Sequence, residues 1–163
     1  MPTTSLTLTT PVVGTVLALA AVPDPVFAGA VVGPGLAVDP DRGEGAAGGG
    51  DDATTVVAPA DGTIIKLHPH AFVLRLDEHR AVLVHLGIDT IELQGAGFTL
   101  LVAEGARVRS GEPVLGWDPG AVAAGGRSPV VPVVAVQGDP GAVRPLVAPG
   151  SRVTLGTPLL EWT

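Results

Sequence analysis

The sequence predicts an all-β fold: an antiparallel β-sandwich or barrel-sandwich hybrid with an internal duplication and at most short helical turns. Glycine (23) and proline (16) are abundant and aromatic residues make up only 3% of the chain, which is typical of short strands joined by many turns. The run 81–86 alternates as a half-buried strand does, with Val82, Val84 and Leu86 on one face. A turn-and-strand pattern also occurs twice along the chain.

Two pairs of matching segments indicate the duplication. The pattern Gly-x-x-Val-x-x-Gly-x-Pro-x-Leu occurs at 105–115 and again at 150–160, and the stretch 14–19 resembles 62–67. Glycine supplies the positive φ angles that tight turns need. Two copies of one β motif that pack together can close a shared core and protect each other's strand edges.

The length of 163 residues fits one domain with a proper core. We expect a flexible N-terminal tail at residues 1–9 and a single domain at residues 10–163. The stretch 41–52 is so rich in glycine that it predicts a loop without regular structure.

Composition also excludes several classes of function. With 9 basic and 16 acidic residues the net charge is −7, which argues against nucleic-acid binding and suits a basic protein partner. Cysteine is absent, so thiolate chemistry and disulfides are excluded. The apolar run Pro11–Val22 is shorter than the about 20 residues of a membrane span, and no Lys or Arg precedes Arg42 to start a signal peptide. We therefore expect a core strand in a cytoplasmic protein without membrane insertion.

The candidate chemistry lies in four histidines between Leu67 and Leu86, because the phosphate-binding loop and the nucleophile-elbow motifs are absent. His79 lies in a polar turn and is expected to be solvated. A hairpin about that turn would place His70 and His85 near the same end of two paired strands. Two histidines that converge in an apolar setting suggest a functional site more than a lone core histidine does.

Two kinds of chemistry fit this spacing, and spacing alone leaves both open. His68, His70, His85 and Asp89 could form a tetrahedral zinc site, as in a zinc-dependent hydrolase of a related β fold. That ligand set resembles the one in zinc-dependent cell-wall peptidases, but there the His-x-x-x-Asp motif precedes the His-x-His motif, and here the order is reversed. The other chemistry is phosphoryl transfer through imidazole, since neutral imidazole is a good nucleophile at pH 7.

The surrounding residues resemble a known family. The segments 22–28, 57–63, 70–72 and 84–93 look like the enzyme IIA component of bacterial sugar phosphotransferase systems, of the type that serves glucose, N-acetylglucosamine and β-glucosides. The likeness runs in collinear order from about Pro11 to the C-terminus, with its core at about 22–134.

The resemblance implies a fold and a function. The family fold is an antiparallel β-sandwich with duplicated halves, and the family needs no cofactor. The resemblance makes His85 the residue that the histidine-containing phosphocarrier protein (HPr) phosphorylates on Nε2, before transfer to a sugar-specific EIIB domain and the EIIC membrane component. His70 matches the second active-site histidine, which supports the transfer.

The resemblance also implies a docking surface. Asp24 and Asp89 match acidic residues that meet an arginine of HPr, and Val26 and Phe27 match its apolar docking surface. Physical reasoning adds Gly87: a carbonyl near it that accepts the Nδ1 proton of His85 would leave Nε2 free and pointing outward.

Some residues depart from the family pattern or fit a third hypothesis. His68 stands where the family usually has threonine, and it could act as a donor or favour adventitious zinc binding with His70 and His85; no resident metal is expected. Gln137 stands where asparagine is common. The turn pattern also resembles biotinyl and lipoyl carrier barrels, but the only lysine, Lys66, is expected inside a strand and not at a hairpin tip.

Overall fold

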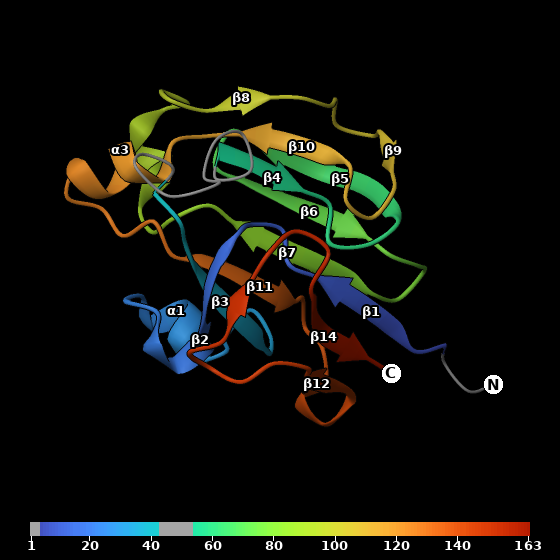
Figure 1. The fold of residues 1–163 in the computed structure, drawn as a ribbon. Coiled ribbons are helices and arrows are strands. Elements are labelled where there is room, and N and C mark those ends of the chain that lie inside the picture. The colour runs from blue at the N-terminus through green and yellow to red at the C-terminus, as the bar shows by residue number, and fades with distance from the viewer. Residues whose placement is uncertain (1–3, 43–53) are drawn as a thin grey trace.

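The computed structural model describes residues 4–42 and 54–163 and is built mostly of short strands (Figure 1). The strands are β1 (Leu6–Thr9), β2 (Gly14–Ala18), β3 (Gly35–Pro40), β4 (Thr55–Val57), β5 (Gly62–His68), β6 (Ala71–Arg75), β7 (Ala81–His85), β8 (Thr99–Leu100), β9 (Arg107–Val108), β10 (Pro113–Gly116), β11 (Val131–Ala135), β12 (Val143–Pro145), β13 (Arg152–Val153) and β14 (Pro158–Trp162). The helical segments among these residues are α1 (Pro25–Ala28), α3 (Pro119–Ala124) and the 3-10 turns η1 (Leu19–Ala21), η2 (Thr90–Leu93) and η3 (Pro140–Ala142).

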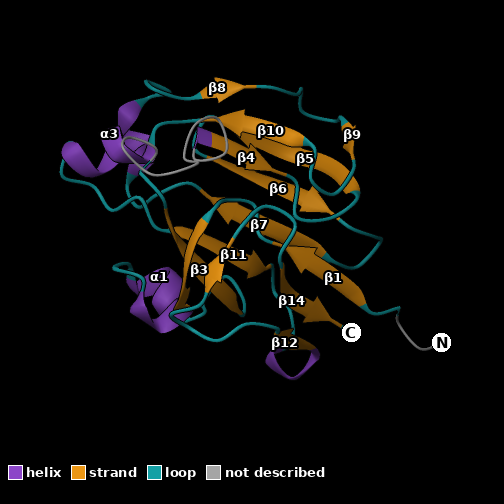
Figure 2. Ribbon diagram, viewed as in Figure 1, coloured by secondary structure: helices purple, strands orange, loops and turns teal. Residues whose placement is uncertain are grey.

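The strands form three sheets, and the ladders that join them are antiparallel (Figure 2). The largest has eight strands in the order β13-β2-β3-β11-β7-β6-β5-β9, and the other two have the orders β1-β14-β12 and β4-β10-β8. The predicted all-β antiparallel fold with short helical turns is therefore confirmed. The apolar run 11–22 contains β2, as expected of a core strand. The glycine-rich loop predicted at 41–52 lies, beyond Arg42, outside the described residues.

The order of strands repeats the duplication seen in the sequence. Strand β13 pairs with β2 at one edge of the large sheet, and β9 pairs with β5 at the other edge. The matching residues occupy matching places, since Gly14 lies opposite Val153 and Gly62 lies opposite Val108. In the small sheets β14 pairs with β1 and β10 pairs with β4. The two repeats are thus two copies of one structural unit.

Glycine is required at equivalent points of the two units. A Cβ on Gly14 would overlap the carbonyl of Asp39, and a Cβ on Gly62 would overlap the carbonyl of Arg75, because a neighbouring strand passes close to each. The repeated turns need positive φ instead, and glycine provides it at positions 105, 111, 150 and 156.

The N-terminal residues correct one expectation. A flexible tail was expected up to residue 9, but Leu6–Thr9 form β1, which pairs with β14. The alternation of leucine and threonine gives this strand one apolar side, and Leu8 is fully buried in the main core. Burial of that side and pairing with β14 order residues 6–9, although half of these residues are polar threonines.

The core fixes the strands that carry the histidines. A large cluster that includes Phe72, Leu74 and Leu86 lies behind β6 and β7. A smaller cluster, which includes Phe27 and Ile88, lies between α1 and the segment that follows β7.

In the described part of the chain, no helix is long and apolar enough to cross a bilayer.

One buried arginine joins both ends of the chain to the β6–β7 turn. Arg80 is only 6% exposed, and its Nη1 donates to the carbonyls of Thr4 (2.7 Å) and Trp162 (2.9 Å). Its Nε and Nη2 lie 2.7 and 2.6 Å from the Asp77 carboxylate. This hydrogen-bonded guanidinium is the main reason why the pKa of Asp77 lies below its usual value.

Replacing this arginine should destabilise the fold strongly. Arg80→Met would leave the Trp162 carbonyl without its donor and Asp77 without its partner, so we expect the free energy of unfolding to fall by about 2–4 kcal/mol. The matched control is Arg144→Met, which breaks the exposed pair with Glu161 and should lower the free energy of unfolding far less, because solvent screens that pair. Urea unfolding of the three proteins measures both values. Equal, small losses would show that Arg80 is not an anchor.

Candidate functional site

The β5–β6–β7 hairpins bring His70 and His85 together. His85 ends β7, and His70 lies in the two-residue turn between β5 and β6. The Leu86 amide donates to the His70 carbonyl at 2.7 Å, which ties the turn to the end of β7. The two ring centroids lie 5.2 Å apart with the rings at 70°, so the hairpin predicted from the sequence places the rings edge to face.

The orientation of His85 is set by the backbone two residues after it. Nδ1 of His85 lies 2.6 Å from the carbonyl oxygen of Gly87. A carbonyl can only accept, so Nδ1 carries the proton in this bond and Nε2 keeps its lone pair. This is the arrangement that the sequence analysis expected near Gly87.

The turn that carries the Gly87 carbonyl is closely packed. Gly87 has φ +80°, and a Cβ there would lie 2.6 Å from Cγ2 of Thr90 and 3.0 Å from the carbonyl of Ser128. Thr90 is itself fully buried and donates its hydroxyl proton to the Leu86 carbonyl at 2.6 Å. The position of the acceptor oxygen is therefore fixed by contacts on both sides.

Burial keeps both histidines neutral at pH 7. Burial lowers the pKa of His85 below its ordinary value, although the Gly87 hydrogen bond and the charges of Asp24 and Asp89 oppose this. Burial is also the main cause that lowers the pKa of His70, with further lowering by His85 and His68. A neutral His85 with a free Nε2 is a nucleophile, and its neighbour His70 is a polar group that can donate a hydrogen bond.

Helix α1 places three of the expected docking residues beside the site. The Asp24 carboxylate caps α1 by accepting from the amides of Val26 (2.8 Å) and Phe27 (3.3 Å), and Pro25 begins the helix. The Phe27 ring lies 5.2 Å from the His85 ring.

Burial changes the role expected for one of these residues. Val26 is 45% exposed, whereas Phe27 is only 8% exposed. Of the two side chains expected to form an apolar docking surface, Val26 is therefore the more exposed. Phe27 packs against the His85 ring.

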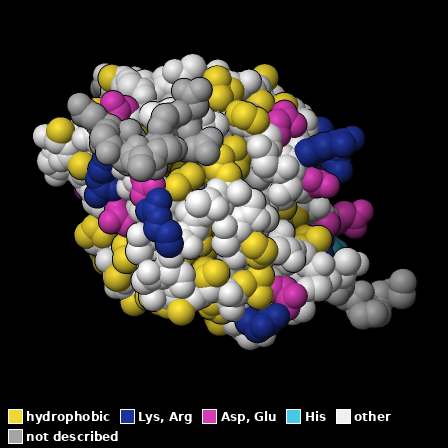
Figure 3. Space-filling view, viewed as in Figure 1, with side chains coloured by type: hydrophobic (Ala, Val, Ile, Leu, Met, Phe, Trp, Pro, Cys, Tyr) yellow, Lys and Arg dark blue, Asp and Glu magenta, His cyan; other side chains and the backbone are white. Residues whose placement is uncertain are grey.

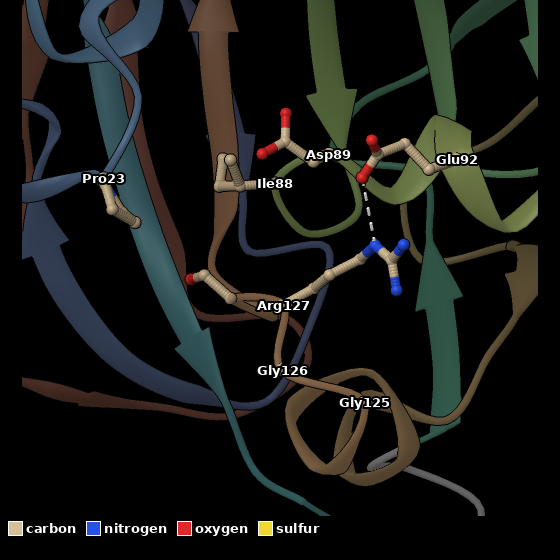
Figure 4. A pocket seen from close by; sticks show the side chains of 8 residues that line it. Pro23, Ile88, Asp89, Glu92, Gly125, Gly126 and Arg127 are labelled. Atoms are coloured by element: carbon tan, nitrogen blue, oxygen red, sulfur yellow. Dashed lines mark hydrogen bonds and ion pairs between the residues drawn. The ribbon is translucent and has the colours of Figure 1, made fainter.

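Asp89 follows His85 by four residues, just after the Gly87 turn. It is exposed, has a left-handed backbone (φ 60°) and begins η2 without a capping hydrogen bond from its side chain. Its carboxylate lines an open pocket of about 540 Å³ together with Glu92 and Arg127, which form an ion pair of 3.3 Å (Figure 4). Glu92 lies in the family-like segment 84–93, but its pairing with Arg127, 35 residues away, could not be predicted from the sequence.

The histidines line a separate hollow of about 380 Å³ on the face of the large sheet. Its lining is formed by Lys66, His68, His70, Ala71, Phe72, Val73, Leu83 and His85. The exposed His68 stacks on His70, with centroids 5.7 Å apart and rings 25° from parallel. Lys66 lies within β5 and not at a hairpin tip, which does not suit a biotinyl or lipoyl carrier.

The zinc alternative lacks its ligand set. Within residues 4–42 and 54–163, no three His, Cys, Asp or Glu side chains are arranged to hold a metal ion. The three histidines share one hollow, but Asp89 lines the other pocket. The geometry therefore favours chemistry at an imidazole nitrogen.

The packing around Gly87 gives a testable expectation. Gly87→Ala adds a Cβ at positive φ and against Thr90, so we expect a loss of about 2–4 kcal/mol in unfolding free energy and displacement of the His85 ring. Gly97→Ala is the matched control, because Gly97 has φ +86° but no heavy atom within 4 Å of the added Cβ, and it should cost only about 1 kcal/mol. Urea unfolding and the NMR shifts of the His85 ring measure the two effects. Similar losses in both variants would refute the fixed turn.

The lowered pKa of His85 can be measured directly. We expect His85 to titrate below 6.5 in the folded protein and near 6.5 in urea. Because the unfolded chain then binds more protons, the free energy of unfolding should fall as the pH drops below about 6.5. An NMR titration of the His85 ring gives the first value, and urea unfolding at several pH values gives the second. A folded midpoint at or above 6.5 would contradict the account.

Comparison with known proteins identifies a family and several relatives that the chain resembles. A family described as phosphoenolpyruvate-dependent sugar phosphotransferase system, EIIA 1, matches residues 6–140. The N-acetylglucosamine-specific EIICBA component of Klebsiella pneumoniae is 40% identical over 94% of this chain, which spans only 22% of that protein. The glucose-specific EIIA component of Bacillus cereus is 33% identical over 82% of this chain and 75% of its own length.

One solved structure with a related name has the same fold as this chain. Glucose permease IIA from Mycoplasma capricolum superimposes with a TM-score of 0.82 at 26% identity and covers 98% of this chain and 96% of its own. The matched family extends over most of the chain, from β1 to the start of η3. The chain belongs to the EIIA 1 family of the phosphoenolpyruvate-dependent sugar phosphotransferase system.

Proposed function

We propose that this chain is a phosphocarrier, which accepts a phosphoryl group from phosphorylated HPr on Nε2 of His85 and passes it to a sugar-specific EIIB domain. The observation that carries the proposal is the 2.6 Å contact between His85 Nδ1 and the Gly87 carbonyl, because it leaves Nε2 as the nucleophile. Two relatives support it, since their names place them in sugar phosphotransferase systems. The protein acts in the cytoplasm, and the membrane components EIIB and EIIC choose the sugar.

In the transfer, the protein forms and breaks a single bond, between His85 and phosphorus. The lone pair of His85 Nε2 forms a bond to phosphorus while the bond from phosphorus to the donor imidazole breaks, and its electron pair returns to that imidazole. The transition state is loose and spreads charge over three equatorial oxygens, so positioning and hydrogen-bond donors supply the catalysis. The same steps in the other direction release the phosphoryl group from His85 to the EIIB domain.

His70 is the donor that supports this transfer. Its ring lies 5.2 Å from the His85 ring between centroids, so a His70 nitrogen that turns toward His85 would reach phosphoryl oxygens bound there. Burial lowers the pKa of His70, so the ring is neutral until a negatively charged phosphoryl group arrives beside it. Neutral imidazole donates through one nitrogen and imidazolium through both.

The docking surface surrounds His85 with acidic and apolar side chains. The charges of Asp24 and Asp89 both reach His85 and raise its pKa, and Val26 is exposed on α1. Carboxylates are poor neighbours for a phosphoryl group, so a cationic side chain of HPr that pairs with them is their better role. The net charge of −7 favours fast, salt-dependent association with such a basic partner.

The proposal predicts one acid-labile phosphate on His85. Incubation with phosphoenolpyruvate, enzyme I and HPr should add a single phosphate to the parent chain and none to His85→Ala, because only His85 offers a free Nε2 in this turn. Intact mass before and after acid treatment measures this. Normal labelling of His85→Ala would refute the assignment.

The role of His70 is tested by measuring separately how His85 accepts phosphate and how it releases phosphate to an EIIB domain. His70→Gln should still accept phosphate on His85 but pass it to an EIIB domain at least about 100-fold more slowly, since a transfer donor is lost. His79→Gln, in the polar β6–β7 turn, is the control and should match the parent. Release from His70→Gln at the parent rate would refute the role of His70.

A further inference from the structure

We infer that His68 is a positioning residue: its ring stacks on His70 and holds that ring at the edge of His85. The two centroids lie 5.7 Å apart with the rings 25° from parallel, whereas His70 meets His85 at 70°. The three rings thus form a row in which His70 has a neighbour on each side. This inference rests on the phosphocarrier function proposed above.

The sheet register shows that His68 acts through His70. His68 pairs with Ala71 across β5 and β6, and Ala71 pairs with His85 across β6 and β7. The backbone of His68 is therefore two strand spacings from His85, about 10 Å. The ring of His68 stacks on that of His70, and it is the His70 ring that meets His85.

The backbone of the hairpin tip is already held in place. Pro69 has a fixed φ and restricts His68 before it to extended conformations. Its ring packs close to Gly95, where an added Cβ would lie 3.4 Å from Cγ of Pro69. The His70 carbonyl accepts from Leu86. What remains free at the tip is rotation of the His70 side chain, and the stacked ring of His68 limits that rotation.

Charge is the competing explanation for a histidine at this place. Lys66 lines the same hollow and, in the described part of the chain, has no carboxylate in ion-pair contact. The hollow therefore contains a basic side chain without His68. What Lys66 lacks, and His68 supplies, is a flat ring that can stack on His70.

Substitutions separate the ring from the charge. We expect His68→Ala to slow the single-turnover transfer from His85 to an EIIB domain by about two- to tenfold, the range typical of one aromatic contact. His68→Phe keeps a flat ring and should transfer at the parent rate, whereas His68→Lys supplies a charge without a ring and should be as slow as His68→Ala. A parent rate in His68→Ala, or rescue by Lys and not by Phe, would overturn the inference.

A second measurement needs no phosphate. NMR of the unphosphorylated protein should show a single, ordered His70 ring in the parent and in His68→Phe, and an averaged ring in His68→Ala. An equally ordered ring in His68→Ala would overturn the positioning role. If the parent accepts no phosphate on His85, the proposed function is wrong, yet this comparison still decides whether His68 holds His70.

Discussion

The hydrogen bond from His85 Nδ1 to the Gly87 carbonyl is the interaction on which the site depends. It fixes the ring tautomer and points Nε2 away from the backbone. Its acceptor is held by a glycine at positive φ, packed against Thr90, at the end of a strand whose other face is core. The same end of β7 binds the β5–β6 turn through Leu86, so the second histidine is positioned by the same short segment.

Burial and charge act on His85 in opposite directions. Burial lowers its pKa, whereas the Gly87 carbonyl and the carboxylates of Asp24 and Asp89 raise it. Burial is the larger effect, so the two carboxylates can lie beside His85 without keeping it protonated. Asp24 is also occupied as the cap of α1, so its position is fixed before any partner arrives. Over the face drawn in Figure 3, acidic and basic side chains are scattered in small mixed groups.

The features that the sequence predicts are those that local patterns encode. The repeated turns indicate the duplicated strands, and the polar turn at His79 indicates the hairpin that brings His70 and His85 together. Strand β1 was missed because its place depends on pairing with β14 at the far end of the chain. The burial of Phe27 and the pocket of Glu92 and Arg127 also depend on contacts between distant segments. His68 looks the same in sequence whether it is solvated or stacked, and only the turn geometry decides.

The central claim is that a carbonyl-bound Nδ1 leaves Nε2 of His85 as the phosphoryl-accepting atom. Nitrogen-15 NMR of the histidine rings, before and after phosphorylation, tests it most directly because it identifies the atom that carries each proton and the phosphorus. The account predicts a proton on Nδ1 of His85 in both states and phosphorus coupled to Nε2 in the phosphorylated state. Phosphorus on Nδ1, or on another histidine, would contradict it.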